Sequence, residues 1–170
     1  NRTPGGPPVP LNAKPDGSVV IEVSSMPNPN HKNRRSVYIF ARRNYHLTEL
    51  NLFDQPTLAH NCTHRRPSAV VLQSLLMLNG SFAFEQARHF AERVVKLAGE
   101  DSMRRIETAF LLALARHPNP EETQLCQTLL DKQSQRYGEQ EQLESRPAAD
   151  AALRNLCQML LNTNEFLYIE

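Results

Sequence analysis

Apolar residues recur every three or four positions through the second half of the chain, and this spacing predicts a series of amphipathic helices. Side chains three and four residues apart lie on one face of a helix, where they can pack on a core. The pattern places helices at residues 82–98, 102–116, from 120 to about 130, and 148–161. The start of the third is marked by Asn119-Pro120-Glu121-Glu122, which combines an Asn cap, a proline at the first helical position and a glutamate at the third.

The segment from Pro67 to Gly80, P-S-A-V-V-L-Q-S-L-L-M-L-N-G, is apolar almost all the way round. A helix without a polar face is normally buried, and this one is too short to cross a membrane. Its interior polar residues are Gln73 and Ser74. We therefore expect a buried central helix in which Gln73 is hydrogen-bonded to backbone, with residues 34–54 as the candidate partner, and Ser81 as the cap of the next helix.

The first third of the chain predicts irregular structure, because most of the twelve prolines lie there. Residues 1–17 hold five prolines and three glycines and should run as an extended strap. Ser18 to Ser24, S-V-V-I-E-V-S, is the strand candidate, and a strand this short needs a partner.

Residues 34–44, R-R-S-V-Y-I-F-A-R-R-N, carry two signals that disagree. The β-branched and aromatic residues favour a strand. The two arginine pairs lie close to two helical turns apart, which would place them on one face of a helix. We favour the helix, followed by a short amphipathic turn or helix over residues 45–53.

These patterns predict a mainly α fold: an irregular bundle of about five to six helices with an extended Pro/Gly-rich strap and at most one short strand pair. The expected organisation is a strap and linker at residues 1–33 and a single helical domain at residues 34–170. The chain begins with Asn1 and lacks a signal-peptide pattern. We expect it to be a processed or excised piece of a longer protein.

Charge is distributed unevenly although the net charge is only +1. Residues 1–99 hold twelve Lys and Arg against six Asp and Glu, whereas residues 100–170 hold seven against twelve. We favour attraction between the two halves within one fold over a nucleic-acid-binding patch, because Tyr38 and Phe40 between the arginines are better core residues than stacking platforms. No nucleic-acid partner and no transmembrane segment are expected.

The three cysteines form no C-x-x-C or C-x-x-C-H pattern. Cys126 and Cys157 lie in separate predicted helices and could form a disulfide if those helices are antiparallel neighbours. We favour a reduced, buried pair that packs as small hydrophobic residues. No haem attachment site is present in this chain.

His60, Cys62 and His64 are the candidate metal ligands. An extended loop would direct all three side chains to one side, as the start of a Zn or Cu site, although a fourth ligand is not evident. The alternative gives the histidines capping or hydrogen-bonding roles and buries Cys62.

Asp54 lies in the sequence between two arginine pairs, Arg42-Arg43 and Arg65-Arg66. Such a group could hold a carboxylate or a sugar, but we interpret it first as structural. Asp54 would accept a bidentate arginine fork and hold the cations that precede the central helix. No nucleophile elbow, phosphate loop or H-E-x-x-H motif is present, so the catalytic residues are unknown.

Several short motifs occur in an order that resembles a known family. They are G-G-P at 5–7, R-R-S-V-Y-I-F-A-R-R-N at 34–44, F-D-Q-P at 53–56, L-Q-S-L-L-M-L-N-G-S-F at 72–82, E-Q-A-R-H-F-A-E-R-V at 85–94, the Arg-x-Pro-x-x-x-Glu turn at 116–122 and L-N-T-N-E-F-L-Y-I-E at 161–170. The chain resembles the planctomycete C-terminal domain of unknown function that follows a cytochrome c-like domain and a second unknown domain in large exported planctomycete proteins. Ser68-Ala69 departs from the Ser-Thr common in relatives.

The resemblance implies an extracytoplasmic location, periplasmic or at the cell surface, and a c-type haem elsewhere in the same polypeptide. The implied function is a non-catalytic structural or interaction module whose partners are its own upstream domains or other surface proteins. The alternative is part of an extracytoplasmic redox or polysaccharide-related enzyme, to which this domain contributes a pocket wall. The family supplies no catalytic residue that could be carried over.

The metal hypothesis predicts one equivalent of Zn or Cu in the purified domain, because three ligands and a fourth group would hold the ion. Elemental analysis after dialysis measures it, with a triple variant carrying Ala at positions 60, 62 and 64 as control. A wild-type domain without stoichiometric metal would end the hypothesis.

Overall fold

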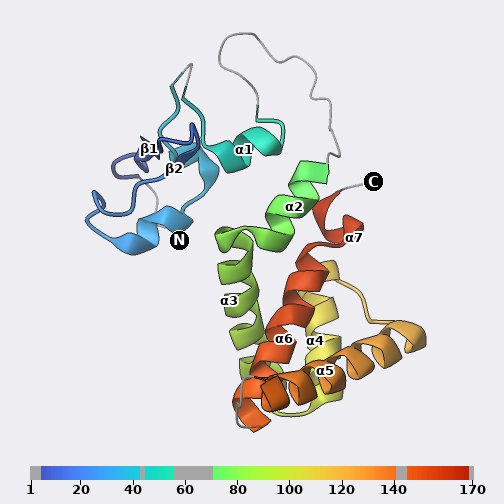
Figure 1. Cartoon of the computed structure of the whole chain (residues 1–170). Helices are drawn as coiled ribbons and strands as arrows, with labels where there is room; N and C mark the ends of the chain where they lie inside the picture. Colours follow the sequence, from blue (N-terminus) through green and yellow to red (C-terminus); the bar gives the residue numbers. More distant parts are fainter. Residues whose placement is uncertain (1–4, 43–44, 56–70, 141–144, 169–170) are drawn as a thin grey trace. The chain divides into compact units, whose positions relative to one another are not determined.

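A computed structural model describes residues 5–42, 45–55, 71–140 and 145–168 (Figure 1). The chain divides into two compact units, Asn1–Gln73 and Ser74–Glu170, which we call the N-terminal and C-terminal units. Its described part holds five helices of at least seven residues and one short two-stranded antiparallel sheet, which confirms the predicted fold class. The division falls later in the chain than the expected end of the strap.

In the N-terminal unit, the strap itself supplies the partner that the predicted strand needs. Strand β1 (Leu11–Ala13) pairs antiparallel with β2 (Val19–Ile21). The turn between them is set locally, because the Asp16 carboxylate accepts the backbone N–H of Ser18 at 2.9 Å. Gly17 has a φ of 85°, which glycine adopts without the steric cost of a Cβ. The predicted strand is therefore confirmed in a shorter form.

Residues 34–42 do not form the helix that the arginine spacing favoured. After a short 3-10 helix, η2 (Ser36–Tyr38), the backbone becomes extended. The buried Val9 donates its N–H to the carbonyl of Tyr38 at 2.7 Å and accepts the N–H of Phe40 at 2.9 Å. The helix prediction is wrong because these β-branched and aromatic residues pair with a segment distant in sequence, in the manner of a strand.

A buried arginine, Arg34, ties the strap to the residues that follow the linker. It comes directly after the 3-10 helix η1 (Pro29–Asn33) and is 7% exposed. Its Nη1 donates to the carbonyl of Pro7 at 2.9 Å, and its Nη2 donates to the carbonyl of Gly5. The guanidinium carbon lies 3.7 Å from the ring centroid of Tyr38, a cation–π contact that stabilises a cation removed from water.

Gln73, the last residue of the N-terminal unit, connects the start of α2 (Val71–Asn79) to the short helix α1 (Thr48–Leu52). Helix α1 is the short helix expected in this region. Gln73 is 2% exposed, and its Nε2 donates to the carbonyl of Leu52 at 2.7 Å. The last carbonyls of a helix lack partners within the helix, so this amide satisfies one of them. Both the predicted burial of Gln73 and its predicted backbone hydrogen bond are confirmed.

The sequence predicted that the apolar side chains of α2 are buried on every face, but several of them are exposed. Four of them are exposed: Val71, Leu72, Leu75 and Leu78. Burial all round a helix requires neighbours on every side. Within the described chain, α2 is covered on the side that carries Gln73 together with the half-buried Leu76 and Met77. The prediction of a helix buried on every face is therefore wrong.

The C-terminal unit is a bundle built on α6 (Ser145–Leu161), as Figure 1 shows. Helices α3 (Ser81–Ala98), α4 (Ser102–Leu114) and α5 (Pro120–Gln140) pack against it, and the short α7 (Asn164–Leu167) follows it. The four helices predicted from apolar spacing are confirmed. None of the described helices is both long and apolar enough to cross a membrane.

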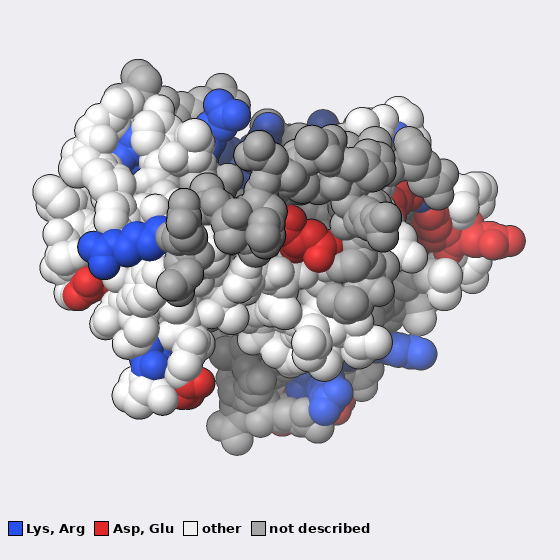
Figure 2. Space-filling model, turned by 90° about the horizontal axis from the view of Figure 1, so that it is seen from above, with Lys and Arg blue, Asp and Glu red and all other residues white. Residues whose placement is uncertain are grey.

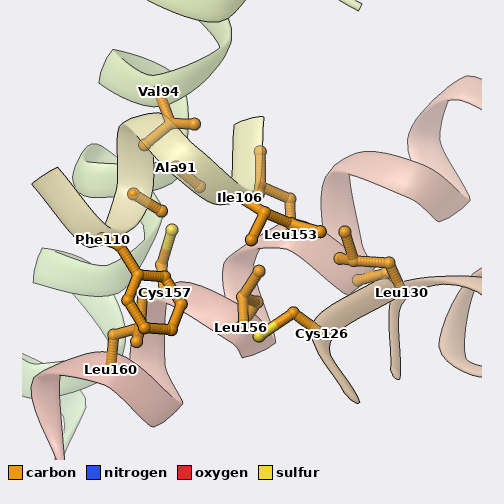
Figure 3. Close-up of a cluster of buried hydrophobic side chains, with 12 residues drawn as sticks. Ala91, Val94, Ile106, Phe110, Cys126, Leu130, Leu153, Leu156, Cys157 and Leu160 are labelled. Carbon is orange, nitrogen blue, oxygen red and sulfur yellow. The ribbon is translucent and has the colours of Figure 1, made fainter. Parts of the chain in front are cut away.

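The apolar faces of these helices converge on one core (Figure 3). Its buried members are Ala91, Val94, Ile106, Ala109, Phe110, Cys126, Leu130, Ala152, Leu153, Leu156, Cys157 and Leu160. Both cysteines are free thiols, as favoured from the sequence. Burial raises the pKa of Cys157 to about 12, so this thiol stays protonated and packs as a small apolar group.

Helix α5 continues to Gln140, beyond the end near residue 130 that the sequence predicted. Its polar second half is held by α6, because the Asn155 amide nitrogen lies 2.8 Å from Gln133 Oε1 and 2.7 Å from the Tyr137 hydroxyl. Polar residues in α5 therefore face a neighbouring helix, which an apolar pattern does not reveal.

The junction of α2 and α3 depends on Gly80. Its N–H donates to the carbonyl of Leu76 at 2.6 Å, and a Cβ at this position would collide with the same carbonyl oxygen. Gly80 takes the cap position of α3, and Ser81, predicted as the cap, is the first helical residue. The start of α3 is therefore set by the close contact between the backbones of Gly80 and Leu76, and not by the hydroxyl of Ser81.

We predict that Gln73→Leu lowers the free energy of unfolding by about 1 to 3 kcal/mol, because the buried carbonyl of Leu52 loses its donor. Thermal and urea unfolding followed by circular dichroism measure the change. Ser74→Ala is the matched control, since Ser74 is the exposed neighbour in the same helix. Equal stabilities of the two variants would contradict the role given to Gln73.

Candidate functional site

An open cavity of about 420 Å³ lies in the C-terminal unit between α4, α5, α6 and α7. We call it the α4–α7 groove. Its walls are mainly apolar and consist of Phe110, Leu114, Leu125, Cys126, Leu129, Met159 and Leu160. Its polar lining residues are Arg116, Glu122, Thr163 and Glu165. The groove thus combines an apolar surface with one small group of charges.

Local backbone signals place these charges. Helix α4 ends at Ala115, whose φ of 55° is in the left-handed region. Helix α5 begins with a reciprocal capping box, in which Asn119 Oδ1 accepts the N–H of Glu122 at 2.8 Å and Glu122 Oε2 accepts the N–H of Asn119 at 2.8 Å. The start signal predicted for this helix is confirmed, and it fixes the Glu122 side chain beside Arg116.

Arg116 binds two carboxylates at once. Its Nη1 and Nη2 donate to Glu122 at 2.8 and 2.7 Å, and its Nε and Nη2 donate to Glu165 at 2.7 and 2.9 Å. A further bond from Nη1 reaches the carbonyl of His117 at 3.1 Å. A guanidinium has five N–H donors, so all of them are used. We call Arg116, Glu122 and Glu165 the Arg116 junction.

Glu165 reaches the junction because the chain turns after α6. Thr163 caps α7, and its hydroxyl accepts the N–H of Phe166 at 3.3 Å. This turn directs Glu165, in the first turn of α7, toward Arg116. The junction therefore joins the segment after α4, the start of α5 and the closing segment of the chain.

The three charged groups hold one another in their ionised forms. Arg116, assisted by the Asn119 N–H, lowers the pKa of Glu122 to about 2. Arg116 also lowers the pKa of Glu165, and the two carboxylates raise the pKa of Arg116. A general acid or base works best with a pKa near the working pH. At neutral pH these groups therefore bind charge and are poorly suited to proton transfer.

A second cavity, of about 520 Å³, lies between α3 and α6. It is lined by Arg88, Ala91, Glu92, Val95, Pro147, Asp150, Ala151 and Arg154. Its lining holds two cations, Arg88 and Arg154, and two anions, Glu92 and Asp150, and Arg88 contacts Glu92 at 3.2 Å. This mixture does not select one ligand charge, so we place the candidate site in the α4–α7 groove.

Most sequence-predicted site residues lie outside the residues that the structure describes. These are His60, Cys62, His64, Arg43, Arg65 and Arg66. The metal site and the proposed ion pairs of Asp54 therefore stay predictions. Asp54 itself has a φ of 56°, and Arg42 lies 4.9 Å from the ring centroid of Phe40. In the described part of the chain, no group of three His, Cys, Asp or Glu residues is arranged to hold a metal ion.

Sequence reasoning missed Arg116, Glu122 and Glu165 as a site. Arg116 and Glu122 belong to the Arg-x-Pro-x-x-x-Glu turn, and Glu165 belongs to the closing N-E-F-L-Y segment. In the sequence, Glu122 is identified as a capping residue of a helix start, and Arg116 and Glu165 only as parts of motifs that resemble a family. The capping box offered a signal, because a glutamate committed to a cap beside an arginine is a natural ion-pair partner.

The two units also differ in charge. The N-terminal unit has nine Lys and Arg against four Asp and Glu, and the C-terminal unit has ten against fourteen. On the face drawn in Figure 2, the described basic and acidic side chains are interspersed. The α4–α7 groove lies in the C-terminal unit, which is the unit with the excess of acidic residues.

Comparison with family models matches residues 1–130 to PSD1, described as a protein of unknown function (DUF1553). The resemblance to a family of unknown function is thereby confirmed. Comparisons with curated proteins and with solved structures give no match to the chain.

We predict that Arg116→Met lowers the melting temperature by several degrees at pH 7, because it leaves two adjacent carboxylates without their cation. The Glu122 pKa is lower in the folded state than its usual 4.5, so its contribution to stability is present above pH 4.5 and is lost as the pH falls toward 2. The deficit of the variant should therefore shrink over this range. Thermal melts from pH 7 to pH 2 test this, with Arg93→Met, at an exposed position of α3, as control. A deficit independent of pH would contradict the ionic role.

Proposed function

The chain belongs to the PSD1 (DUF1553) family of proteins of unknown function, and we propose that it serves as a non-catalytic interaction module. The observation that carries this proposal is the pairing of an open apolar groove with an ion junction in which all five donors of Arg116 are used. The apolar walls provide surface that a partner can bury. The charged groups beside them are held as ions by one another, which suits orientation of a partner better than catalysis.

We place this module in an exported, cytochrome c-associated multidomain planctomycete protein. The support is the motif resemblance, in which a cytochrome c-like domain and a second domain precede this one. An extracytoplasmic location and a c-type haem elsewhere in the polypeptide follow from the same proposal. The partners are the upstream domains of the same polypeptide, and other surface proteins form a second group.

Both units have features that fit a module whose folding is set by its own contacts. In the N-terminal unit, the buried side chains of Arg34 and Gln73 join segments distant in sequence by donating hydrogen bonds to backbone carbonyls. The Arg116 junction closes the C-terminal unit through side chains distant in sequence. Exposed apolar side chains such as Leu125 and Met159 then remain available for a partner.

The proposal predicts that the module stays bound to the rest of its polypeptide after the connecting chain is cut. A specific protease site placed before Asn1 in the full protein would allow cleavage of the folded molecule. The two fragments should co-elute in size-exclusion chromatography. Their dissociation constant should be micromolar or lower, which corresponds to a binding free energy of about −8 kcal/mol or more favourable. Complete separation of the fragments would contradict the proposal.

A catalytic role would give a different outcome in the same protein. If the intact protein has an activity that Glu122→Gln abolishes while the cleaved fragments still co-elute, the module belongs to an active site. The Leu97→Gln variant is the control, because Leu97 is 57% exposed on α3 and does not line the groove.

A further inference from the structure

We infer that the α4–α7 groove binds an amphipathic helical segment of a partner protein, with a Lys or Arg of that segment at the Arg116 junction. This inference rests on the proposed function and specifies the chemistry of the partner. Helices that dock in this manner lay one apolar face into a hydrophobic groove, using side chains at positions i, i+3, i+4 and i+7.

Two of the seven apolar residues that line the groove are exposed to solvent, whereas Phe110, Cys126 and Leu160 are buried. Leu125 is 70% exposed and Met159 is 43% exposed, although both line the same cavity. A pocket for a small molecule normally encloses most of its ligand. The exposure of these two side chains fits a larger occupant, which would cover Leu125 and Met159 from outside while its own side chains enter the cavity.

The charges of the groove determine the sign of the partner. Glu122 and Glu165 share the single cation Arg116, so the junction carries a net charge of about −1 at neutral pH. The five donors of Arg116 are all engaged, and Glu122 Oε2 accepts both Arg116 and the Asn119 N–H. The other three carboxylate oxygens, Glu122 Oε1 and the two of Glu165, each accept one of these bonds and can accept a further one. The junction is therefore complementary to a cation and repels an anion.

The surrounding unit reinforces this preference. It holds fourteen Asp and Glu against ten Lys and Arg, so a basic segment is attracted from a distance and an acidic one is repelled. The occupant that satisfies both the walls and the rim is a helix with an apolar face and a terminal cation.

Designed peptides test the inference directly. Three fluorescent peptides of the same length would share one leucine face and differ at one end in carrying Lys, Gln or Glu. Binding to the full 170-residue chain would be measured by fluorescence anisotropy at low salt. The Lys peptide should bind about tenfold more tightly than the Glu peptide, and the difference should decrease at high salt.

Matched variants locate the binding site. Leu125→Gln should weaken the Lys peptide about tenfold, because a leucine at the interface loses its apolar burial. Leu97→Gln, an equally conservative change at an exposed leucine outside the groove, should leave affinity within about twofold. Circular dichroism melts establish that both variants remain folded.

The inference is overturned if the Lys and Glu peptides bind equally, if Leu125→Gln leaves the affinity of the Lys peptide unchanged, or if no peptide binds more tightly than about 1 mM. Its failure is distinguishable from failure of the proposed function. If the cleaved fragments still co-elute when the module carries Leu125→Gln, the interaction-module proposal stands and the groove is not the binding site. Fragments that separate in the wild-type protein, with groove-dependent peptide binding intact, would do the reverse.

Discussion

In the C-terminal unit, one guanidinium that binds two carboxylates joins three segments around the apolar core. Arg116 lies just past the end of α4, Glu122 is in the first turn of α5 and Glu165 is in α7, so a single side chain holds three segments together. Because Glu122 also accepts the N–H of Asn119, the same carboxylate caps α5 and binds the arginine. The ion pairs and the backbone geometry of the turn are therefore coupled, and neither can change without the other.

Buried polar side chains that donate to backbone carbonyls also organise the N-terminal unit. Arg34 binds the carbonyls of Gly5 and Pro7 beneath an aromatic ring, and Gln73 binds the last residue of α1. In each case a buried polar group would destabilise the fold if it lacked its partner. These contacts join segments that the motif pattern had shown only in sequence order. The G-G-P motif and the R-R-S motif, which contains Arg34, are thus in contact in the folded chain.

The structure differs most from the sequence predictions in segments whose contacts with distant parts of the chain could not be predicted. The apolar sequence of α2 predicted burial on every face, yet Leu72, Leu75 and Leu78 are exposed in the structure. Residues 34–42 had helical arginine spacing, but their backbone pairs with Val9. Periodicity reports which face a residue would occupy in a regular element. It does not report whether a neighbour covers that face, or whether a distant strand competes for the same backbone groups.

The sequence by itself determined the helices α3 to α6, the start of α5 and the burial of Gln73, because apolar spacing, capping residues and a lone amide in an apolar helix act over a few residues. Only the tertiary structure decided the candidate site. Arg116 and Glu165 are 49 positions apart, and no local rule relates residues at that distance. Their contact requires α6 to pack along the bundle and return the closing segment to α4. The groove exists for the same reason, since its walls come from helices that meet only after the core has formed.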